Sequence, residues 1–112
     1  MKEPIIFIEH ILENIEDIEN FTENVDKNDF LENKEKQNAV IRSLEIIGEA
    51  VKSIPQKIKI KYKSIPWKEI AGTRDKIIHH YFGVDLELVW KIVQENISNL
   101  KGQILEIKRD LV

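Results

Sequence analysis

Side chains that could do acid–base or phosphate chemistry are more concentrated in one short segment, residues 74–81, than anywhere else in this chain. It reads Arg74, Asp75, Lys76, Ile77, Ile78, His79, His80 and Tyr81. The chain has only three arginines and three histidines, so finding one arginine and two histidines in eight residues is a marked concentration. A guanidinium that stays charged, beside imidazoles that titrate near neutral pH, can bind a phosphate and move protons around it.

On a helix, the residues of this segment fall on two faces. Asp75 and His79 are four residues apart, so the carboxylate could orient the imidazole, although an ordinary surface pair has the same spacing. Arg74 falls in the middle of the apolar face, where a buried guanidinium needs a carboxylate or an anionic ligand. That partner is either Glu45 or Glu49, in a structural pair, or a phosphate.

The two histidines do not predict a metal site. His79 and His80 are adjacent and point in different directions from a regular helix, so they cannot share one metal ion. Tyr81 returns to the Arg74 face, where it is equally well explained as a half-buried core aromatic. The common glycine-rich phosphate loops and hydrolase motifs are absent from the sequence. We therefore expect neither a metal nor a cofactor.

Charge is distributed unevenly along the chain. Residues 1–35 carry eleven acidic and three basic side chains, a net charge of −8, whereas residues 51–68 carry six lysines and no acid. A cationic surface beside the reactive segment suits a polyanionic substrate. The lysines expected to contact it are Lys57, Lys59, Lys61, Lys63, Lys68 and Lys76. Solvated lysines that keep a small domain soluble explain the same pattern.

Length and composition limit the class of protein. A chain of 112 residues is the size of one domain, so we expect a single domain over residues 1–112. The absence of cysteine excludes disulfides, thiolate catalysis and cysteine-based metal sites. No charge-free run is long enough to span a membrane, and the N-terminus lacks the features of a signal peptide. These features predict a cytoplasmic protein with no membrane association.

Apolar periodicity predicts the elements that position the reactive segment. Helices are expected at about 4–22, at about 33–53, from Pro66 to near Gly83, and from an N-cap at Asp85 towards the C-terminus. Residues 57–63 alternate between lysine and isoleucine or tyrosine, which alone indicates a half-buried strand, although no partner strand is predicted. The fold class expected is all-α, an antiparallel bundle of four to five helices.

Apolar residues are expected to form the buried stripes of these helices. They are Ile8, Ile11, Leu12, Ile15 and Ile18 in the first, Val40, Ile41, Leu44, Ile47, Val51 and Ile54 in the second, and Leu86, Val89, Trp90, Val93, Ile97, Leu100, Ile104 and Ile107 in the last. Gly48 would allow close packing inside the second helix, and Trp67 and Trp90 would anchor the core. Because Arg74 and His79 lie on different faces of one ideal helix, a joint site needs a helix end, a neighbouring chain or a groove that runs between the faces. A symmetric dimer would supply such a groove.

Several short motifs together resemble one protein family. They are Gly48-Glu49-Ala50, Ile65-Pro66-Trp67, the Arg-x4-His-x-Tyr motif at 74–81, then Phe82, Val84-Asp85 and Val89-Trp90. With these motifs, nearly the whole chain resembles the HepT-like ribonuclease toxins of the HEPN superfamily. The resemblance implies a HEPN-like helical bundle, a homodimer with two motifs at one cleft, and a helical or irregular segment at 57–63.

The resemblance also implies an activity. Family members resemble metal-independent endoribonucleases in which the motif arginine and histidine act on RNA, here Arg74 and His79, supported by Asp75. His79 would take the 2′-hydroxyl proton or protonate the leaving oxygen, and Arg74 would stabilise charge on the phosphoryl group. The chain would thus be the toxin of a type VII-like HEPN/MNT toxin–antitoxin pair. His80 stands at the variable position of the motif, where it could replace or compete with His79.

The partner implied is an MNT-type nucleotidyltransferase antitoxin that transfers AMP to the motif tyrosine, here Tyr81. The added bulk and negative charge would oppose RNA binding. One alternative is a non-catalytic helical partner of a minimal nucleotidyltransferase, with Arg74 holding a nucleotide phosphate. Another is a structural bundle with a buried arginine–glutamate pair, in which Arg74→Met would be tolerated.

Overall fold

The computed structural model describes residues 3–79 and 83–112, with His79 described by its backbone alone. These residues form eight helices and one short antiparallel ribbon. The elements are α1 (Pro4–Thr22), α2 (Lys27–Glu32), α3 (Lys34–Lys52), α4 (Gln56–Lys61), α5 (Trp67–Ala71), α6 (Thr73–Ile77), β1 (Ile78–His79), β2 (Gly83–Val84), α7 (Leu86–Glu95) and α8 (Ile97–Leu111). The all-α fold class predicted from the sequence is confirmed.

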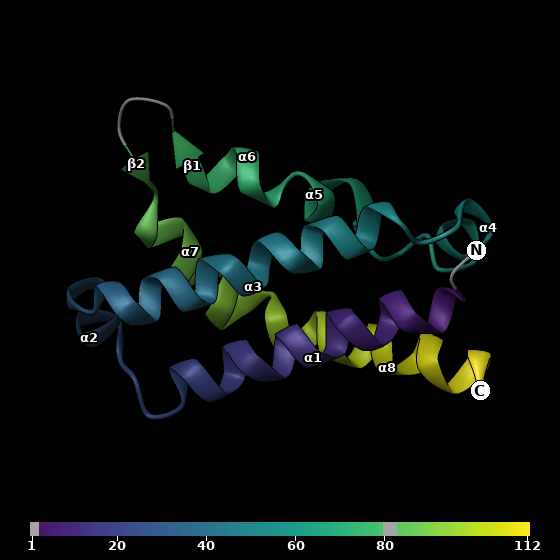
Figure 1. Cartoon of the computed structure of the whole chain (residues 1–112), viewed down its shortest axis with the longest axis horizontal. Coiled ribbons are helices and arrows are strands. Elements are labelled where there is room, and N and C mark those ends of the chain that lie inside the picture. The colour runs from purple at the N-terminus through teal and green to yellow at the C-terminus, as the bar shows by residue number, and fades with distance from the viewer. Residues whose placement is uncertain (1–2, 80–82) are drawn as a thin grey trace.

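The helices are arranged as an antiparallel bundle whose chain runs up and down its long axis (Figure 1). Helix α1 forms one leg and α3 returns beside it. The pair α5 and α6 forms a third leg along α3, and α7 followed by α8 forms a fourth. Helix α2 and the β1–β2 ribbon lie at one end, while α4 and both chain termini lie at the other. Two of the legs that the sequence predicts as single helices are each divided in two.

The bundle is held by the apolar stripes predicted from the sequence. All five predicted residues of α1 and all six from Val40 to Ile54 are buried, as are Ile97, Leu100, Ile104 and Ile107 of α8. Leu86, Trp90 and Val93 are half-buried and pack against this core. Burial of these side chains is the main stabilising contribution available to a chain without disulfides.

Local signals set the ends of the long helices. Pro4 occupies the first turn of α1, where its missing N–H has no intrahelical partner to lose. The Asn33 side chain accepts a hydrogen bond from the Lys36 N–H at 3.0 Å and caps α3. The Asp85 side chain caps α7 in the same way, from the Leu88 N–H at 3.0 Å. These caps explain why the predicted boundaries at 4–22, 33–53 and Asp85 agree with the structure.

The lysine-rich alternating segment is helical, as the family resemblance implies. Residues 56–61 form α4, with Ile58 buried and Ile60 exposed. A lone strand would leave its backbone groups unpaired, whereas a helix bonds them internally. The strand indicated by the alternating pattern is therefore wrong, and a short helix forms in its place.

Helix α2 was not predicted. Its six residues are too few to display a periodic stripe, yet Phe30 is fully buried and its ring lies 5.2 Å from that of Trp90. Trp67 is also buried, and its indole N–H donates to the Tyr62 carbonyl at 3.1 Å. The expectation that both tryptophans anchor the core is confirmed, with Trp90 half-buried.

Gly48 allows α3 and α5 to approach closely, as expected. A Cβ placed on Gly48 would lie 3.3 Å from the Ile70 carbonyl oxygen and 3.6 Å from that of Ala71. Both atoms belong to the α5 backbone, so a side chain here would push α5 away. The position of the third leg thus depends on this glycine.

Candidate active site

The third leg differs from the single helix predicted over residues 66–83. Helix α5 ends at Ala71, Gly72 separates it from α6, which spans only Thr73–Ile77, and β1 follows directly. Glycine has low helix propensity, which favours the break between the two short helices. The Ile77 carbonyl accepts its hydrogen bond from the Asp85 N–H at 2.7 Å, a partner from beyond the ribbon. The helical wheel used for the sequence prediction therefore does not apply after Ile77.

Arg74 lies on the surface of α6, and the prediction that it is buried in the apolar face is wrong. Its side chain is 65% exposed, while Ile77 is the residue of α6 that enters the core. The break at Gly72 changes the face that α6 presents to the bundle, and Arg74 turns outward. The motif cation is therefore accessible to a ligand from solvent.

Glu45 of α3 holds the Arg74 side chain. The Arg74 Nε atom lies 3.2 Å from the Glu45 Oε2 atom, and the Glu45 side chain is 38% exposed. The predicted alternative, Glu49, instead contacts Lys52 of its own helix at 3.2 Å. A carboxylate on Nε fixes the direction of the guanidinium, whose planar group carries further N–H donors for an oxyanion. Of the two glutamates considered from the sequence, Glu45 is the partner, and the pair lies at the surface and is not buried.

Asp75 and His79 do not share a helix, so the predicted hydrogen-bonding geometry of residues four apart on one helix is wrong. Asp75 is exposed on α6, whereas the backbone of His79 belongs to β1 and pairs with Gly83. The reason is the helix end at Ile77. The His79 side chain, His80 and Tyr81 lie outside the described residues, so their predicted roles remain predictions.

The β1–β2 ribbon fixes the backbone at the motif histidine. Ile78 pairs with Val84, and Gly83 has φ 76°, a left-handed conformation that glycine adopts without strain. Asp85 joins the ribbon to the bundle, since its N–H bonds Ile77 and its carboxylate caps α7. The sequence identified Asp85 only as a helix cap and missed its role at the motif.

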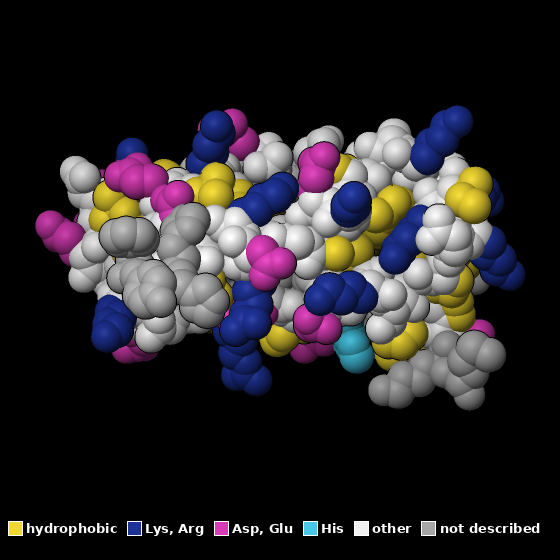
Figure 2. Space-filling model, turned by 90° about the horizontal axis from the view of Figure 1, so that it is seen from above, with side chains coloured by type: hydrophobic (Ala, Val, Ile, Leu, Met, Phe, Trp, Pro, Cys, Tyr) yellow, Lys and Arg dark blue, Asp and Glu magenta, His cyan; other side chains and the backbone are white. Residues whose placement is uncertain are grey.

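The lysines predicted to contact RNA fall into two groups. Lys57, Lys59 and Lys61 belong to α4 and Lys63 follows it, at the end of the bundle opposite the ribbon (Figure 1). Figure 2 shows several dark-blue side chains towards that end, with others along the middle of the same face. Lys68 lies on α5, and Lys76 lies on α6, two residues from Arg74. Of these six lysines, Lys76 is the one that belongs to the motif segment itself.

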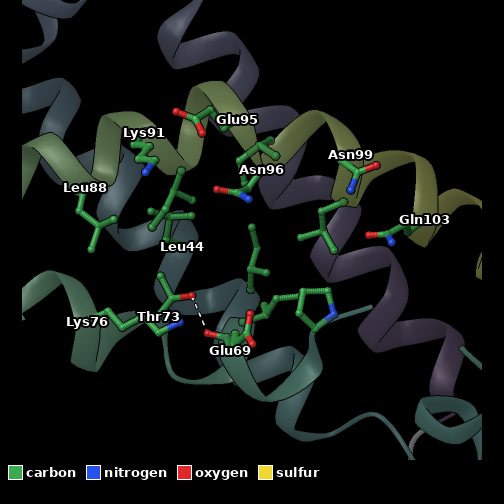
Figure 3. Close-up of a pocket in the computed structure, with 16 residues that line it drawn as sticks. Leu44, Glu69, Thr73, Lys76, Leu88, Lys91, Glu95, Asn96, Asn99 and Gln103 are labelled. Atoms are coloured by element: carbon green, nitrogen blue, oxygen red, sulfur yellow. Dashed lines mark hydrogen bonds between the residues drawn. The ribbon is translucent and has the colours of Figure 1, made fainter. Parts of the chain in front are cut away.

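A groove of about 400 Å³ runs beside α6 (Figure 3). It lies between α3, the third leg and the fourth leg, with Thr73 and Lys76 of α6 on its wall. Polar residues of α7, of α8 and of the junction between them line the opposite wall: Lys91, Glu95, Asn96, Asn99 and Gln103. The sequence prediction missed this groove, although three amides at positions 96, 99 and 103 have the spacing of one helix face.

Two described groups with shifted pKa values lie away from the motif. The hydrogen bond that the Tyr62 hydroxyl donates to Asp110 raises the pKa of Tyr62 to about 12 and joins α4 to α8. The hydrogen bond from Lys101 to Glu19, at 2.8 Å, raises the pKa of the lysine, opposed by partial desolvation. Both shifts reflect contacts that hold the α8 leg in place.

The residues that the structure describes contain neither a metal-binding cluster nor a membrane-spanning helix. Among them, no group of three or more histidine, aspartate or glutamate side chains is arranged to hold a metal ion. Within the same part of the chain, no helix is both long and apolar enough to cross a membrane.

Comparison with known proteins identifies the family. The sequence model described as "Ribonuclease HepT-like" matches residues 11–107. The chain belongs to the HepT-like ribonuclease family. The family resemblance inferred from the motifs is thereby confirmed, and the fold described above is that of a family member.

Relatives within the family match most of the chain. A Thermococcus cleftensis protein named "probable ribonuclease HepT" is 50% identical over 103 residues, covering 92% of this chain and 94% of the relative. A Methanocaldococcus jannaschii protein named as a putative RNase is 49% identical over 105 residues, covering 94% and 87%. A second M. jannaschii protein, named as a gamma-glutamylcyclotransferase and putative RNase, is 49% identical over 110 residues. That match covers 98% of this chain and 50% of the relative. No solved structure matches the chain.

Proposed function

We propose that this protein is an endoribonuclease that cleaves RNA without a metal ion and acts as the toxin of a HEPN/MNT toxin–antitoxin pair. The observation that carries the proposal is the exposed Arg74 guanidinium, held through Nε by Glu45 at 3.2 Å. A cation fixed at the surface on one side can bind a phosphate on the other. Family membership and the names of the relatives support RNA as the substrate.

The proposed reaction is an internal transfer within the RNA. The 2′-oxygen forms a bond to phosphorus while the bond from phosphorus to the 5′-oxygen breaks, leaving a 2′,3′-cyclic phosphate and a free 5′-hydroxyl. The 2′-hydroxyl proton leaves to a base, and the 5′-oxygen receives a proton from an acid. His79 serves these proton transfers, and Arg74 stabilises the charge that develops on the phosphoryl oxygens. Asp75, one residue from Arg74, supports the site electrostatically.

A homodimer would complete the site. One imidazole cannot act as base and acid in a single step, so two copies of the motif at one cleft would supply the two histidines. Helix α6 and the adjoining ribbon lie on the outside of the bundle, a position that would let two protomers bring their motifs together (Figure 1). The lysines of α4 would then contact RNA that extends away from the cleft.

Regulation by the antitoxin would act at the same motif. Transfer of AMP from ATP to the Tyr81 hydroxyl, with release of pyrophosphate, would place a phosphodiester beside the motif. Its negative charge would pair with the Arg74 guanidinium and repel an RNA phosphate. The nucleotidyltransferase would therefore silence cleavage without unfolding the toxin.

The test is inducible expression of the wild type, Arg74→Ala and His79→Ala, with growth and the integrity of total RNA as readouts. Arg109→Ala and His10→Ala are matched controls, because these residues are also exposed and lie on α8 and α1. We expect the wild type and both controls to arrest growth and degrade RNA, and the two motif variants to be harmless. Co-expression of the nucleotidyltransferase should restore growth.

Purified protein provides the quantitative readout. Cleavage of a defined RNA in the presence of EDTA should fall about 10²–10³-fold in Arg74→Ala and His79→Ala, the range typical of losing an electrostatic or acid–base group. Intact helical circular dichroism shows that the variants are folded. Undiminished cleavage by either folded variant contradicts the proposal. A wild type without nuclease activity, in a stable complex with the nucleotidyltransferase, favours the non-catalytic partner instead.

A further inference from the structure

The groove beside α6 has an apolar floor and a polar rim. The floor and walls are lined by Leu44, Ile47, Pro66, Ile70, Leu88, Ile92, Ile97 and Leu100. These residues come from α3, α5, α7, α8 and the segment before α5, so the groove is formed only where three legs of the bundle meet. Its volume of about 400 Å³ is within the range of small-ligand sites, about 300–1,000 Å³.

The rim offers hydrogen-bonding groups that no described residue uses. Asn96, Asn99 and Gln103 line the groove, and their side-chain amides form no hydrogen bond within the part of the chain that the structure describes. An amide presents donors and an acceptor side by side, the arrangement that pairs with the edge of a nucleobase. Glu69 and Glu95 add further acceptors on the two walls.

The two ends of the groove carry different polar groups. In Figure 3, Lys76 and Lys91 lie at one end of the groove, while Asn99 and Gln103 lie at the other. Lys76 and Thr73 flank Arg74 in the sequence of α6, so the lysine end adjoins the motif. Neither lysine forms an ion pair with another described residue. Cations are thus nearest the proposed phosphate site and amides are farther from it.

We propose that this groove is a nucleobase subsite, which holds one base of the RNA strand next to the phosphate at Arg74. The inference rests on the proposed function and specifies how the substrate is bound. The apolar floor would cover the face of the base, and the amides would bond its edge, as in recognition of single-stranded RNA. Two lysines and two glutamates leave the rim with no net charge, which suits a neutral base more than a second phosphate.

Direct binding measurements test the subsite without requiring cleavage. The probes are a fluorescent 2′-O-methyl RNA hexamer, which has no 2′-hydroxyl to react, and an abasic strand of the same length. The double variant Asn99→Ala/Gln103→Ala removes two groove amides. The control Asn20→Ala/Asn38→Ala removes two exposed amides from α1 and α3.

We expect wild type and control to bind the base-containing strand more tightly than the abasic strand. The groove variant should lose about tenfold in affinity for the base-containing strand, the effect of two hydrogen bonds, and keep its affinity for the abasic strand. Equal losses for both strands, or no loss, would overturn the subsite.

Two further outcomes separate this inference from the nuclease proposal and from a protein occupant. If the wild type cleaves ordinary RNA but the groove variant binds like the control, the subsite is wrong and the nuclease proposal stands. If the wild type never cleaves RNA but shows the groove-dependent preference for bases, the subsite stands and the nuclease proposal fails. A change in oligomeric mass by light scattering in the groove variant alone assigns the groove to a second copy of the chain and overturns the subsite.

Discussion

Substitution of Gly48 tests the packing that sets the position of the motif-bearing leg. Two methyl groups of valine would extend beyond a Cβ that already lies 3.3 Å from the Ile70 carbonyl oxygen. The obstructing atoms are backbone, so α5 must shift, because no side chain can rotate away. Gly102 of α8 is the matched control, since a Cβ there would meet no described atom within 4 Å.

The expected effects have opposite signs at the two glycines. Overpacking at Gly48→Val should lower the free energy of unfolding by about 1–3 kcal/mol. At Gly102→Ala, the exposed helix gains about 0.8–1.0 kcal/mol from the higher helix propensity of alanine. For a domain of this size, about 1 kcal/mol corresponds to about 4 °C in Tm. Gly48→Val should therefore melt about 4–12 °C below the wild type, and Gly102→Ala about 3–4 °C above it.

Thermal unfolding followed by far-UV circular dichroism, at one protein concentration for all variants, provides the comparison. Equal concentrations are needed because a dimer would make Tm depend on protein concentration. A Gly48→Val protein that melts at or above the wild-type temperature would refute the close approach of α3 and α5. Because α5 leads directly into α6, the same variant should also impair RNA cleavage more than its loss of stability alone would.

Two other predictions concern electrostatic contacts. Glu45→Gln should change the free energy of unfolding by less than about 1 kcal/mol, because the pair with Arg74 is largely exposed, yet lower RNA cleavage by releasing the guanidinium; unchanged cleavage would contradict the positioning role. The Tyr62 pKa, raised from 10.0 to about 12, implies that its hydrogen bond to the α8 carboxylate contributes fully below pH 10 and is lost as the pH rises through 12. Absorbance titration of Tyr81→Phe, in which Tyr62 is the only tyrosine, should show a midpoint near 12, and a midpoint at 10 would count against this contact.

The long helices could be predicted because their signals are local. Pro4, Asn33 and Asp85 mark helix starts through groups within the same turn, and apolar residues at three- and four-residue steps identify the buried face. The last leg shows the limit of such signals, since Asn96 divides it into α7 and α8. Asparagine is only a moderate helix breaker, so its effect is not decided by sequence alone.

The candidate site was harder to predict because a distant contact forms it. If residues from Pro66 to near Gly83 formed one regular helix, Arg74 would lie in its apolar face. The hydrogen bond from the Asp85 N–H to the Ile77 carbonyl spans eight residues and ends that helix early. Because the helix is also broken at Gly72, residues of α6 do not lie on the faces expected for one continuous helix. Arg74 therefore lies at the surface beside Glu45.

The sequence by itself determined the family and the all-α class, and it supplied the residues proposed to act on a phosphate, because residue type, period and capping are properties of short segments. Tertiary structure alone decided that Arg74 is exposed, that Glu45 is its partner, and that a groove lined with amides adjoins α6. The lysines of α4 were likewise placed at the far end of the bundle by the path of the chain (Figure 1). These features depend on how separate legs pack, and that packing is fixed by contacts between residues far apart in the sequence.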